Sequence, residues 1–275
     1  MSGVRPSAGF TSSWDAFDFS IAGGVGTITF SRPDKLNALT FDVYADLRDL
    51  LREVPLMEDV DVLVITGTGR GFCSGGDVDE IIGELVGYDA RRLLEFTRMT
   101  GAVIQSMRDC RQPIIAAVNG TTAGAGAVIA LAADFRIVAE HARFHFLFTR
   151  VGLSGGDMGS AYLLPRMVGL GRATEILMFG DPVDAATALD IGLATRVVAG
   201  DDLGSATAEL AQRLADGPAF AYSATKLLLT REQDLDLAGA VELEAMTQAL
   251  LMKTGDHAEF YAAFTEGRDP EWKGR

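Results

Sequence analysis

Cysteine is rare in this chain, with only Cys73 and Cys110 among 275 residues. We interpret both as reduced thiols with structural roles, Cys73 as a small turn residue and Cys110 near a helix end. A disulfide between them and a nucleophilic thiol are the alternatives. Because neither alternative has a motif to support it, other residue types must carry any chemistry that the chain performs.

Basic residues are also in the minority, with 24 Lys and Arg against 38 Asp and Glu and a net charge of −14. Binding to nucleic acid or to an anionic membrane surface requires clustered Lys and Arg, so the sequence predicts neither partner. The first 13 residues lack the apolar segment of a signal peptide, and no apolar run reaches membrane-spanning length without interruption. A cytoplasmic location is the default expectation.

The composition that remains is that of a globular protein, with 48% hydrophobic residues and 23% charged residues. The length allows one core with a terminal extension. Residues 1–13 are rich in Ser, Gly and Pro, and they predict a disordered tail. We expect residues 14–200 to form the core that carries the ligand site, and residues 201–275 to form a helical region.

Hydrophobic periodicity and turn signals place the elements. A hairpin is predicted over 19–31 around Gly23-Gly24, and Thr40 is the predicted N-cap of a helix ending at Glu53. Further on, the sequence predicts a strand at 61–66, a helix at 89–111, a strand, glycine turn and helix over 114–133, and a strand at 135–138. The later helical segments are 160–168, 172–179, 184–191, 202–215, 219–230, 237–253 and 258–265. The switch from alternation to helices alone predicts an α/β core with a helical C-terminal part.

Two glycine-rich turns, each after a short apolar run, are the most informative feature. The first spans residues 69–77, and the second spans residues 119–126 and opens a helix of small residues. Glycine lets a ligand approach backbone N–H groups closely, and a helix N-terminus favours negative charge. Two such donors that converge on one oxygen would hold an oxyanion without any side chain.

These motifs resemble the crotonase (enoyl-CoA hydratase/isomerase) superfamily over about residues 19–273. The resemblance is carried, in order, by RPDKLNAL at 32–39, FCSGGD at 72–77, PIIAAVNG at 113–120, ADFRI at 133–137 and PEWKGR at 270–275. It implies a spiral core of ββα turns, an acyl-CoA thioester substrate, and a homotrimer or dimer of trimers assembled through the helices of 201–275. By the same analogy, the N–H groups of Gly76 and Ala125 are the oxyanion donors. The family usually has glycine at the second of these positions.

The carboxylates depart from the family pattern. The two glutamates that position water in the family's hydratases correspond to Val128 and Phe148, and neither side chain can transfer a proton. One acid remains nearby, Asp157, in a turn where dienoyl-CoA isomerases, chlorobenzoyl-CoA dehalogenases and a β-diketone hydrolase of the superfamily carry a catalytic aspartate. Counting back from the following helix aligns Asp157 with the aspartate of the first two enzymes, whereas counting forward shifts the match by one residue. A structural N-cap is the competing interpretation.

The resemblance also implies a coenzyme A site. It places Lys35, Ala38 and the backbone of residues 72–78 around the adenine and the pantetheine. Within that backbone we expect contacts from Phe72, Ser74, Asp77 and Val78, together with a lining from Val128 and Phe148. Lys273, from the same or a neighbouring subunit, could meet a phosphate, and ordinary surface charge is its alternative role.

Other acids near the first turn have simpler explanations. Asp77 is expected to order its loop and cap the next helix. Asp79 and Glu80 are candidates for a second acid/base, but a solvated helix face explains them more simply. The sequence predicts no metal site, and no cofactor other than the coenzyme A of the substrate.

The sequence therefore predicts an acyl-CoA-processing enzyme in which Gly76 and Ala125 stabilise a thioester enolate and Asp157 moves a proton. Hydration of an enoyl-CoA and migration of a double bond are the leading reactions. Hydrolysis of a C–C bond in a β-dicarbonyl substrate is the alternative enzyme activity. A non-catalytic acyl-CoA-binding or RNA-binding relative is the alternative of another class, and the acidic balance argues against RNA.

Overall fold

The computed structural model describes residues 3–5 and 13–274. The strands in this part of the chain are β1 (Phe17–Ala22), β2 (Val25–Phe30), β3 (Val62–Gly67), β4 (Gly71–Cys73), β5 (Ile114–Val118), β6 (Thr121–Ala123), β7 (Phe135–Ala139), β8 (Arg143–His145), β9 (Val183–Asp184) and β10 (Arg196–Val198). The α-helices are α1 (Phe41–Glu53), α2 (Gly83–Leu85), α3 (Ala90–Asp109), α4 (Ala125–Ala132), α5 (Ser160–Val168), α6 (Leu170–Phe179), α7 (Ala185–Asp190), α8 (Leu203–Ala215), α9 (Ala219–Arg231), α10 (Leu237–Leu251) and α11 (Gly255–Glu266).

The strands form two sheets that the chain visits alternately. The larger has the order β1-β2-β3-β5-β7-β10, and the smaller has the order β4-β6-β8-β9. Each of β3, β5 and β7 is followed by a short strand of the smaller sheet, and β4, β6 and β8 pair there in parallel. This repeated passage from one sheet to the other, followed by a helix in the first two turns, is a ββα spiral. The predicted α/β, crotonase-like fold is confirmed.

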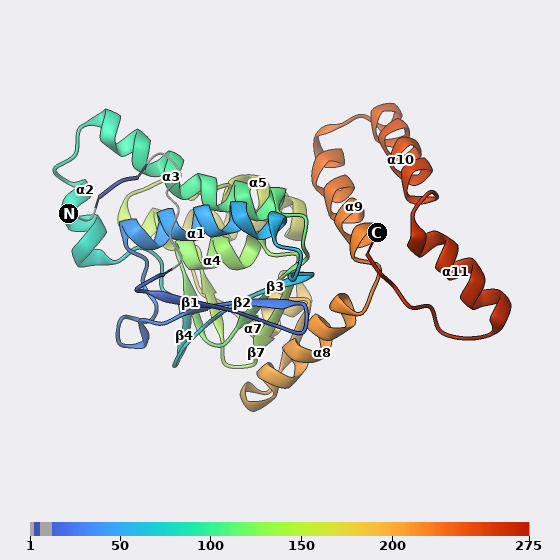
Figure 1. Ribbon diagram of the computed structural model, residues 1–275. Helices are drawn as coiled ribbons and strands as arrows, with labels where there is room; N and C mark the ends of the chain where they lie inside the picture. The colour runs from blue at the N-terminus through green and yellow to red at the C-terminus, as the bar shows by residue number, and fades with distance from the viewer. Residues whose placement is uncertain (1–2, 6–12, 275) are drawn as a thin grey trace.

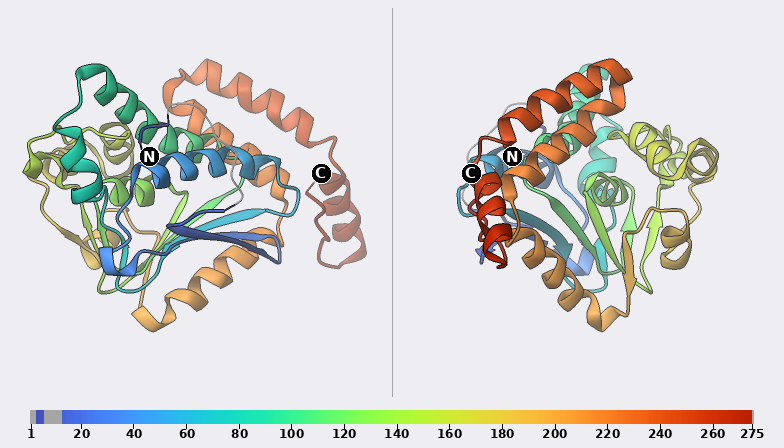
Figure 2. Two further views of the ribbon diagram at one scale, coloured as in Figure 1. Left: turned by 60° about the vertical axis from the view of Figure 1, so that its left-hand side comes forward. Right: turned by 90° about the vertical axis from the view of Figure 1, so that its right-hand side faces the viewer.

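Helices cover both faces of the larger sheet. α1, α3 and α4 lie on one face, and α8 lies on the other, where it contacts β3, β5 and β7 (Figures 1 and 2). α9, α10 and α11 extend beyond the sheet, with α10 packed on α9 (Figure 1). No helix among the described residues is both long enough and apolar enough to cross a membrane.

Local signals explain why several elements begin where they do. The Thr40 hydroxyl accepts a 3.3 Å hydrogen bond from the Val43 N–H, so the side chain satisfies one of the free donors of the first turn of α1. Asp89 caps α3 in the same way, at 2.9 Å from the Arg92 nitrogen. The apolar face of α1 is then buried against the sheet, with Leu47 and Leu51 fully enclosed.

Part of the predicted tail, residues 3–5, is described by the structure and contacts the rest of the chain. Val4 packs against the hydrophobic core, and the Arg5 guanidinium pairs with Asp46 on α1, with Asp42 3.6 Å away. The Arg48 guanidinium of α1 also donates to the Arg5 carbonyl at 2.6 Å. Residues 1–2 and 6–12 of the predicted tail lie outside the described residues. Arg5 therefore docks on α1 because α1 presents carboxylates to it.

Candidate active site

The first glycine-rich turn follows β4 and depends on glycine for its path. Gly75 has a φ of +95°, and a Cβ built there would lie 3.0 Å from the Ala123 carbonyl oxygen and 3.4 Å from the Ala125 nitrogen. A parallel bridge joins Leu39 to the turn, with the Leu39 N–H donating to the Gly75 carbonyl and the Asp77 N–H donating to Leu39. Between these bonds, the Gly76 N–H has no acceptor in the described chain.

The second turn meets the first at close range. Gly124 has a φ of +51° and precedes α4, and a Cβ on Gly126 would lie only 2.2 Å from the Cys73 carbonyl oxygen. The Ala125 N–H belongs to the first turn of α4, where helix donors have no intrahelical partner, and it bonds to nothing else in the described residues. The structure thus brings the two predicted turns together, with one unpaired backbone donor from each.

Asp157 lies in the loop before α5 and is half-buried. Its carboxylate accepts one 2.9 Å bond from the Met158 N–H, and it forms no ion pair with the described residues. Burial raises the pKa of Asp157 above its ordinary value, and the Met158 N–H opposes that rise only in part. The N-cap of α5 is Gly159, without a side-chain bond, so Asp157 does not cap the helix.

Tyr44 of α1 lies near the first turn and is influenced electrostatically by Asp157. Its hydroxyl lies 3.6 Å from the position of a Cβ built on Gly76. Burial, together with the proximity of Cys73 and Asp157, raises the pKa of Tyr44 well above its ordinary value. Sequence reasoning missed Tyr44, because in the sequence it is one of several large residues spaced along α1.

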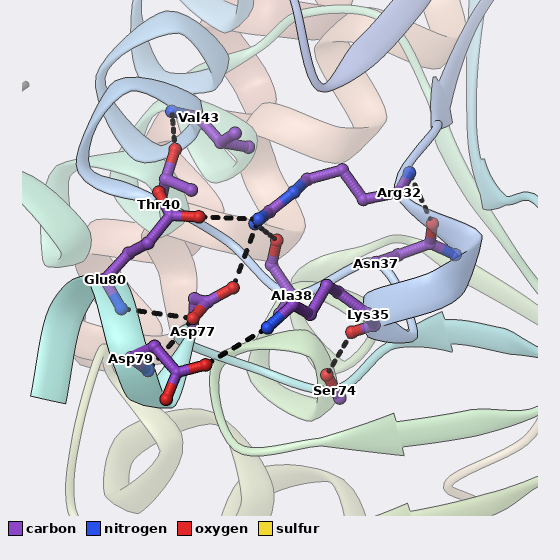
Figure 3. Close-up of polar contacts among 10 residues, drawn as sticks. All are labelled: Arg32, Lys35, Asn37, Ala38, Thr40, Val43, Ser74, Asp77, Asp79 and Glu80. Atoms are coloured by element: carbon purple, nitrogen blue, oxygen red, sulfur yellow. Dashed lines mark hydrogen bonds and ion pairs between the residues drawn. The ribbon is translucent and has the colours of Figure 1, made fainter.

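Charged residues form the rim beside the first turn (Figure 3). The Lys35 Nζ lies 3.1 Å from Asp79, and the Arg32 guanidinium lies 3.2 Å from Asp77 and 2.8 Å from Glu80. Asp77 caps the π-helical segment η3 (Val78–Ile82) by accepting from the Asp79 and Glu80 N–H groups, as expected. The hydrogen bonds that Asp77 accepts, together with Arg32 and Lys35, lower the pKa of Asp77 despite its burial.

The predicted coenzyme A residues of the first turn gather at this rim. The Ser74 hydroxyl donates to the Lys35 carbonyl at 3.3 Å, and the Ala38 carbonyl accepts from Arg32 at 2.8 Å (Figure 3). Val78 is 70% exposed at the rim, whereas the Phe72 side chain is fully buried against Phe30. For Phe72, only the backbone is therefore available to a ligand. Arg32 and its two carboxylate partners were missed as a unit, because the chain separates them by more than 40 residues.

Comparison with known proteins decides the family. The sequence profile of the enoyl-CoA hydratase/isomerase family matches residues 20–275. The chain belongs to this family. The resemblance to the crotonase superfamily is thereby confirmed, and with it an enoyl-CoA hydratase/isomerase type of enzyme.

Individual relatives carry both reaction names. A crystal structure of a candidate enoyl-CoA hydratase from Streptomyces coelicolor A3(2) is 59% identical, with a TM-score of 0.95 and complete coverage of both chains. The 1,2-epoxyphenylacetyl-CoA isomerase of Escherichia coli K12 is 32% identical over 92% of this chain and 96% of its own. A trans-2-decenoyl-acyl-carrier-protein isomerase of Streptococcus mutans is 29% identical over 94% of this chain and 97% of its own.

The two positions expected to correspond to the hydratase glutamates are apolar and buried in this enoyl-CoA hydratase/isomerase chain. Val128 lies in α4 with no exposed surface, and Phe148 lies in the 3-10 segment η4 (Leu147–Val151) with 7% exposed. Neither side chain can hold a water by hydrogen bonds. The α4 helix is buried along its whole length, so Val128 is closed to solvent in the structure.

Lys273 does not join the other predicted site residues. It lines a cavity of about 690 Å³ with Val60, Asp61 and Gln112, at the N-terminal ends of β3 and β5. The two turns follow the C-terminal ends of the same strands. A phosphate contact from Lys273 within one chain is thus not supported, and a contact from a neighbouring subunit stays a prediction.

Proposed function

We propose that this chain moves a double bond along the acyl group of an enoyl-CoA thioester. The backbone N–H groups of Gly76 and Ala125 would hold the thioester oxygen, and Asp157 would carry the proton. The observation behind this is the contrast between the apolar Val128 and Phe148 and the half-buried, unpaired Asp157 with its raised pKa.

The reaction needs one acid/base group and no water. The Asp157 carboxylate takes a proton from Cγ of the enoyl group, and the electron pair of the broken C–H bond moves into the conjugated system. Negative charge then develops on the thioester oxygen, where two backbone donors stabilise it. Protonated Asp157 returns the proton to Cα, which leaves the double bond between Cβ and Cγ and restores the carboxylate.

The raised pKa suits this role. A carboxyl whose pKa lies nearer to neutrality is a stronger base toward a C–H bond than an ordinary aspartate, and it releases the proton less readily to solvent. Two of the relatives above are named isomerases, which is consistent with isomerisation. One relative is described as a hydratase, so the name alone does not decide the reaction.

Replacement of Asp157 tests the proposal. Asp157→Asn should lower kcat for isomerisation of a β,γ-enoyl-CoA by roughly 10²-fold or more, while acyl-CoA binding persists. Asp236→Asn is the matched control, because Asp236 caps α10 away from the turns and Asn caps a helix equally well. Wild-type kcat in purified Asp157→Asn would rule out the catalytic role.

Hydration offers a second, independent test. Addition of water to crotonyl-CoA requires a site that holds the water molecule by hydrogen bonds. The apolar side chains of Val128 and Phe148 provide no such site. We expect kcat/KM for hydration at least 10³-fold below that of a good hydratase of the family. A value near the diffusional ceiling of about 10⁸ M⁻¹s⁻¹ would show that another group positions the water.

The two alternatives from the sequence predict different assay results. A C–C hydrolase would consume a β-dicarbonyl thioester faster than any enoyl-CoA, with the same dependence on Asp157. A non-catalytic relative would bind coenzyme A thioesters and turn over none of them. Turnover of an enoyl-CoA that is faster than that of a β-dicarbonyl thioester and falls with Asp157→Asn would exclude both.

A further inference from the structure

Tyr44 is a buried tyrosine whose hydroxyl has no hydrogen-bond partner among the described residues, although the side chain is only 3% exposed. Its ring lies edge-on to Phe96, with centroids 6.0 Å apart, in an aromatic cluster that also holds Phe41 and Tyr88. The ring of Tyr44 is buried, but its hydroxyl oxygen stays accessible, and the described residues supply no acceptor for it. Tyrosine hydroxyls in such positions usually find a partner.

The hydroxyl lies beside the oxyanion turn. It is 3.6 Å from the Cβ position of Gly76, and the Ile81 side chain lies 4.0 Å from the same point. The charge of Asp157 contributes to the raised pKa of Tyr44, so the two groups are within electrostatic reach of each other. Because its pKa is raised, Tyr44 stays protonated at neutral pH and acts as a hydrogen-bond donor, not as a base.

The thioester oxygen is not the acceptor that fits this donor. A carbonyl oxygen offers two lone pairs, and the N–H groups of Gly76 and Ala125 would occupy both. An acceptor for Tyr44 in the complex would then be another oxygen of the acyl group, a water molecule or the Asp157 carboxylate. A hydrocarbon chain would exclude water from the hydroxyl and leave it unpaired.

We propose that Tyr44 donates a hydrogen bond to an oxygen atom that the acyl group carries beyond the thioester. The substrates would then be oxygen-bearing acyl-CoA thioesters, in preference to plain hydrocarbon ones. The inference rests on the proposed function, because that function places the thioester at Gly76. A site built to hydrogen-bond a substrate oxygen discriminates strongly against the analogue that lacks it.

Matched ligands test the proposal without catalysis. Pairs of saturated acyl-CoA thioesters of equal length, in which an ether oxygen replaces the γ, δ or ε methylene, are titrated by calorimetry into wild type, Tyr44→Phe and Tyr88→Phe. Wild type should bind the oxygen-bearing member at least about tenfold more tightly at one of these positions. Tyr44→Phe should abolish that preference and bind the hydrocarbon member as well as wild type does.

Tyr88 is the control because it belongs to the same aromatic cluster, but its hydroxyl already donates to Glu84 at 3.0 Å. Tyr88→Phe should keep the preference. No preference in wild type at any of these positions, or equal weakening of both ligands in Tyr44→Phe, would overturn the proposal. Saturated thioesters undergo no isomerisation, so failure of the proposed reaction would leave this binding test intact. Absence of any binding would overturn both.

Discussion

The core and the C-terminal helices of this chain differ in how far their apolar side chains are buried. In the core, every residue of α4 is buried, and so is every residue of β5. In α10 no residue is buried, and large apolar side chains of α10 and α11 are exposed, namely Leu237, Val241, Met246, Leu250, Phe260, Tyr261 and Phe264. A monomer rarely leaves so many such groups open to water. The apolar residues of the core are enclosed within one chain, whereas those of the C-terminal helices are exposed in it.

The junction between the two regions is polar and well defined. Lys226 of α9 lies 2.7 Å from Asp134, and Arg108 of α3 lies 3.0 Å from the same carboxylate. Lys226 also donates to the Gln112 carbonyl at 2.9 Å, and Arg108 donates to the Thr230 hydroxyl at 2.7 Å. These buried contacts fix where the C-terminal helices leave the core, and α10 and α11 project from that base.

The largest expected effect is on stability, from a substitution at the close contact between the two glycine-rich turns. Gly126→Ala would put a Cβ 2.2 Å from the Cys73 carbonyl oxygen, and backbone on both sides would have to move. We expect a loss of more than about 3 kcal/mol in the free energy of unfolding. Thermal and denaturant unfolding at matched protein concentration would measure it.

Gly101→Ala in α3 is the control, because a Cβ there meets nothing within 4 Å. It should be neutral, or stabilise the chain by up to about 1 kcal/mol, since alanine favours helix more than glycine does. Equal stability of both variants would show that the contact between the turns is looser than described.

The next effect concerns the C-terminal helices. We expect a homotrimer or a dimer of trimers, and Leu250→Asp or Phe264→Asp should weaken assembly about 10- to 100-fold each, because a buried large apolar side chain contributes about 1.5–3 kcal/mol. Light scattering over a concentration series would measure the mass. Leu170→Asp, at an exposed apolar residue of α6, should leave the trimer intact. A wild-type monomer at micromolar concentration would contradict this prediction.

A change of pH should then separate turnover from assembly. Burial raises the pKa of Asp157, and the base must be ionised to accept a proton. Below that pKa, kcat/KM should fall about tenfold per pH unit, with a midpoint above that of an ordinary aspartate. The trimer should persist over the same range. A profile whose acid limb lies at the ordinary aspartate value would contradict the role of Asp157.

The raised pKa of Asp157 also determines how the stability of the folded chain changes with pH. Folding raises the pKa of Asp157, so between the unfolded and folded values the folded chain binds more protons. Its contribution to stability therefore falls as pH rises through that window. Asp157→Asn should raise the unfolding midpoint slightly at neutral pH while it lowers turnover.

The smallest effect is expected at the rim. Asp79 pairs with Lys35, and the hydrogen bond between them raises the pKa of Lys35. Asp79→Asn should free Lys35 for a coenzyme A phosphate and tighten binding about two- to fivefold at low salt, an effect that salt should weaken. Asp34→Asn, nearby and with no described partner for its carboxylate, is the control. Weaker binding by Asp79→Asn would show that Lys35 needs its partner.

The sequence predicted the elements of the core closely, because their signals are local. The Thr40 cap, the hairpin at Gly23-Gly24 and the bounds of α5 all follow from periodicity and turn chemistry over a few residues. The smaller sheet was not predicted, since its strands are two or three residues long and carry no usable pattern.

The candidate site likewise combines features that local motifs predict with features that depend on long-range contacts. The motifs placed the two glycine-rich turns, which the structure brings together, whereas the roles of Asp157, Val128 and Phe148 stay predictions. The neighbourhood of Tyr44, the Arg32 cluster and the separation of Lys273 from the rim depend on contacts across long stretches of chain, which no local pattern encodes. The boundary at residue 200 stays a prediction, although α8 beyond it lies on the core sheet.

The pairing of β4 with β6 has a consequence for how relatives of this chain can diverge. Gly71 pairs with Thr121 and Cys73 with Thr122, so the ladder of the smaller sheet, with its strand spacing of about 4.8 Å, sets the distance between the two turns. Backbone hydrogen bonds alone set this distance, and no side chain contributes to it. Side chains around the turns can therefore change between relatives while the spacing of the two turns stays the same. Substitutions that alter proton transfer need not disturb the backbone groups proposed to bind the thioester oxygen.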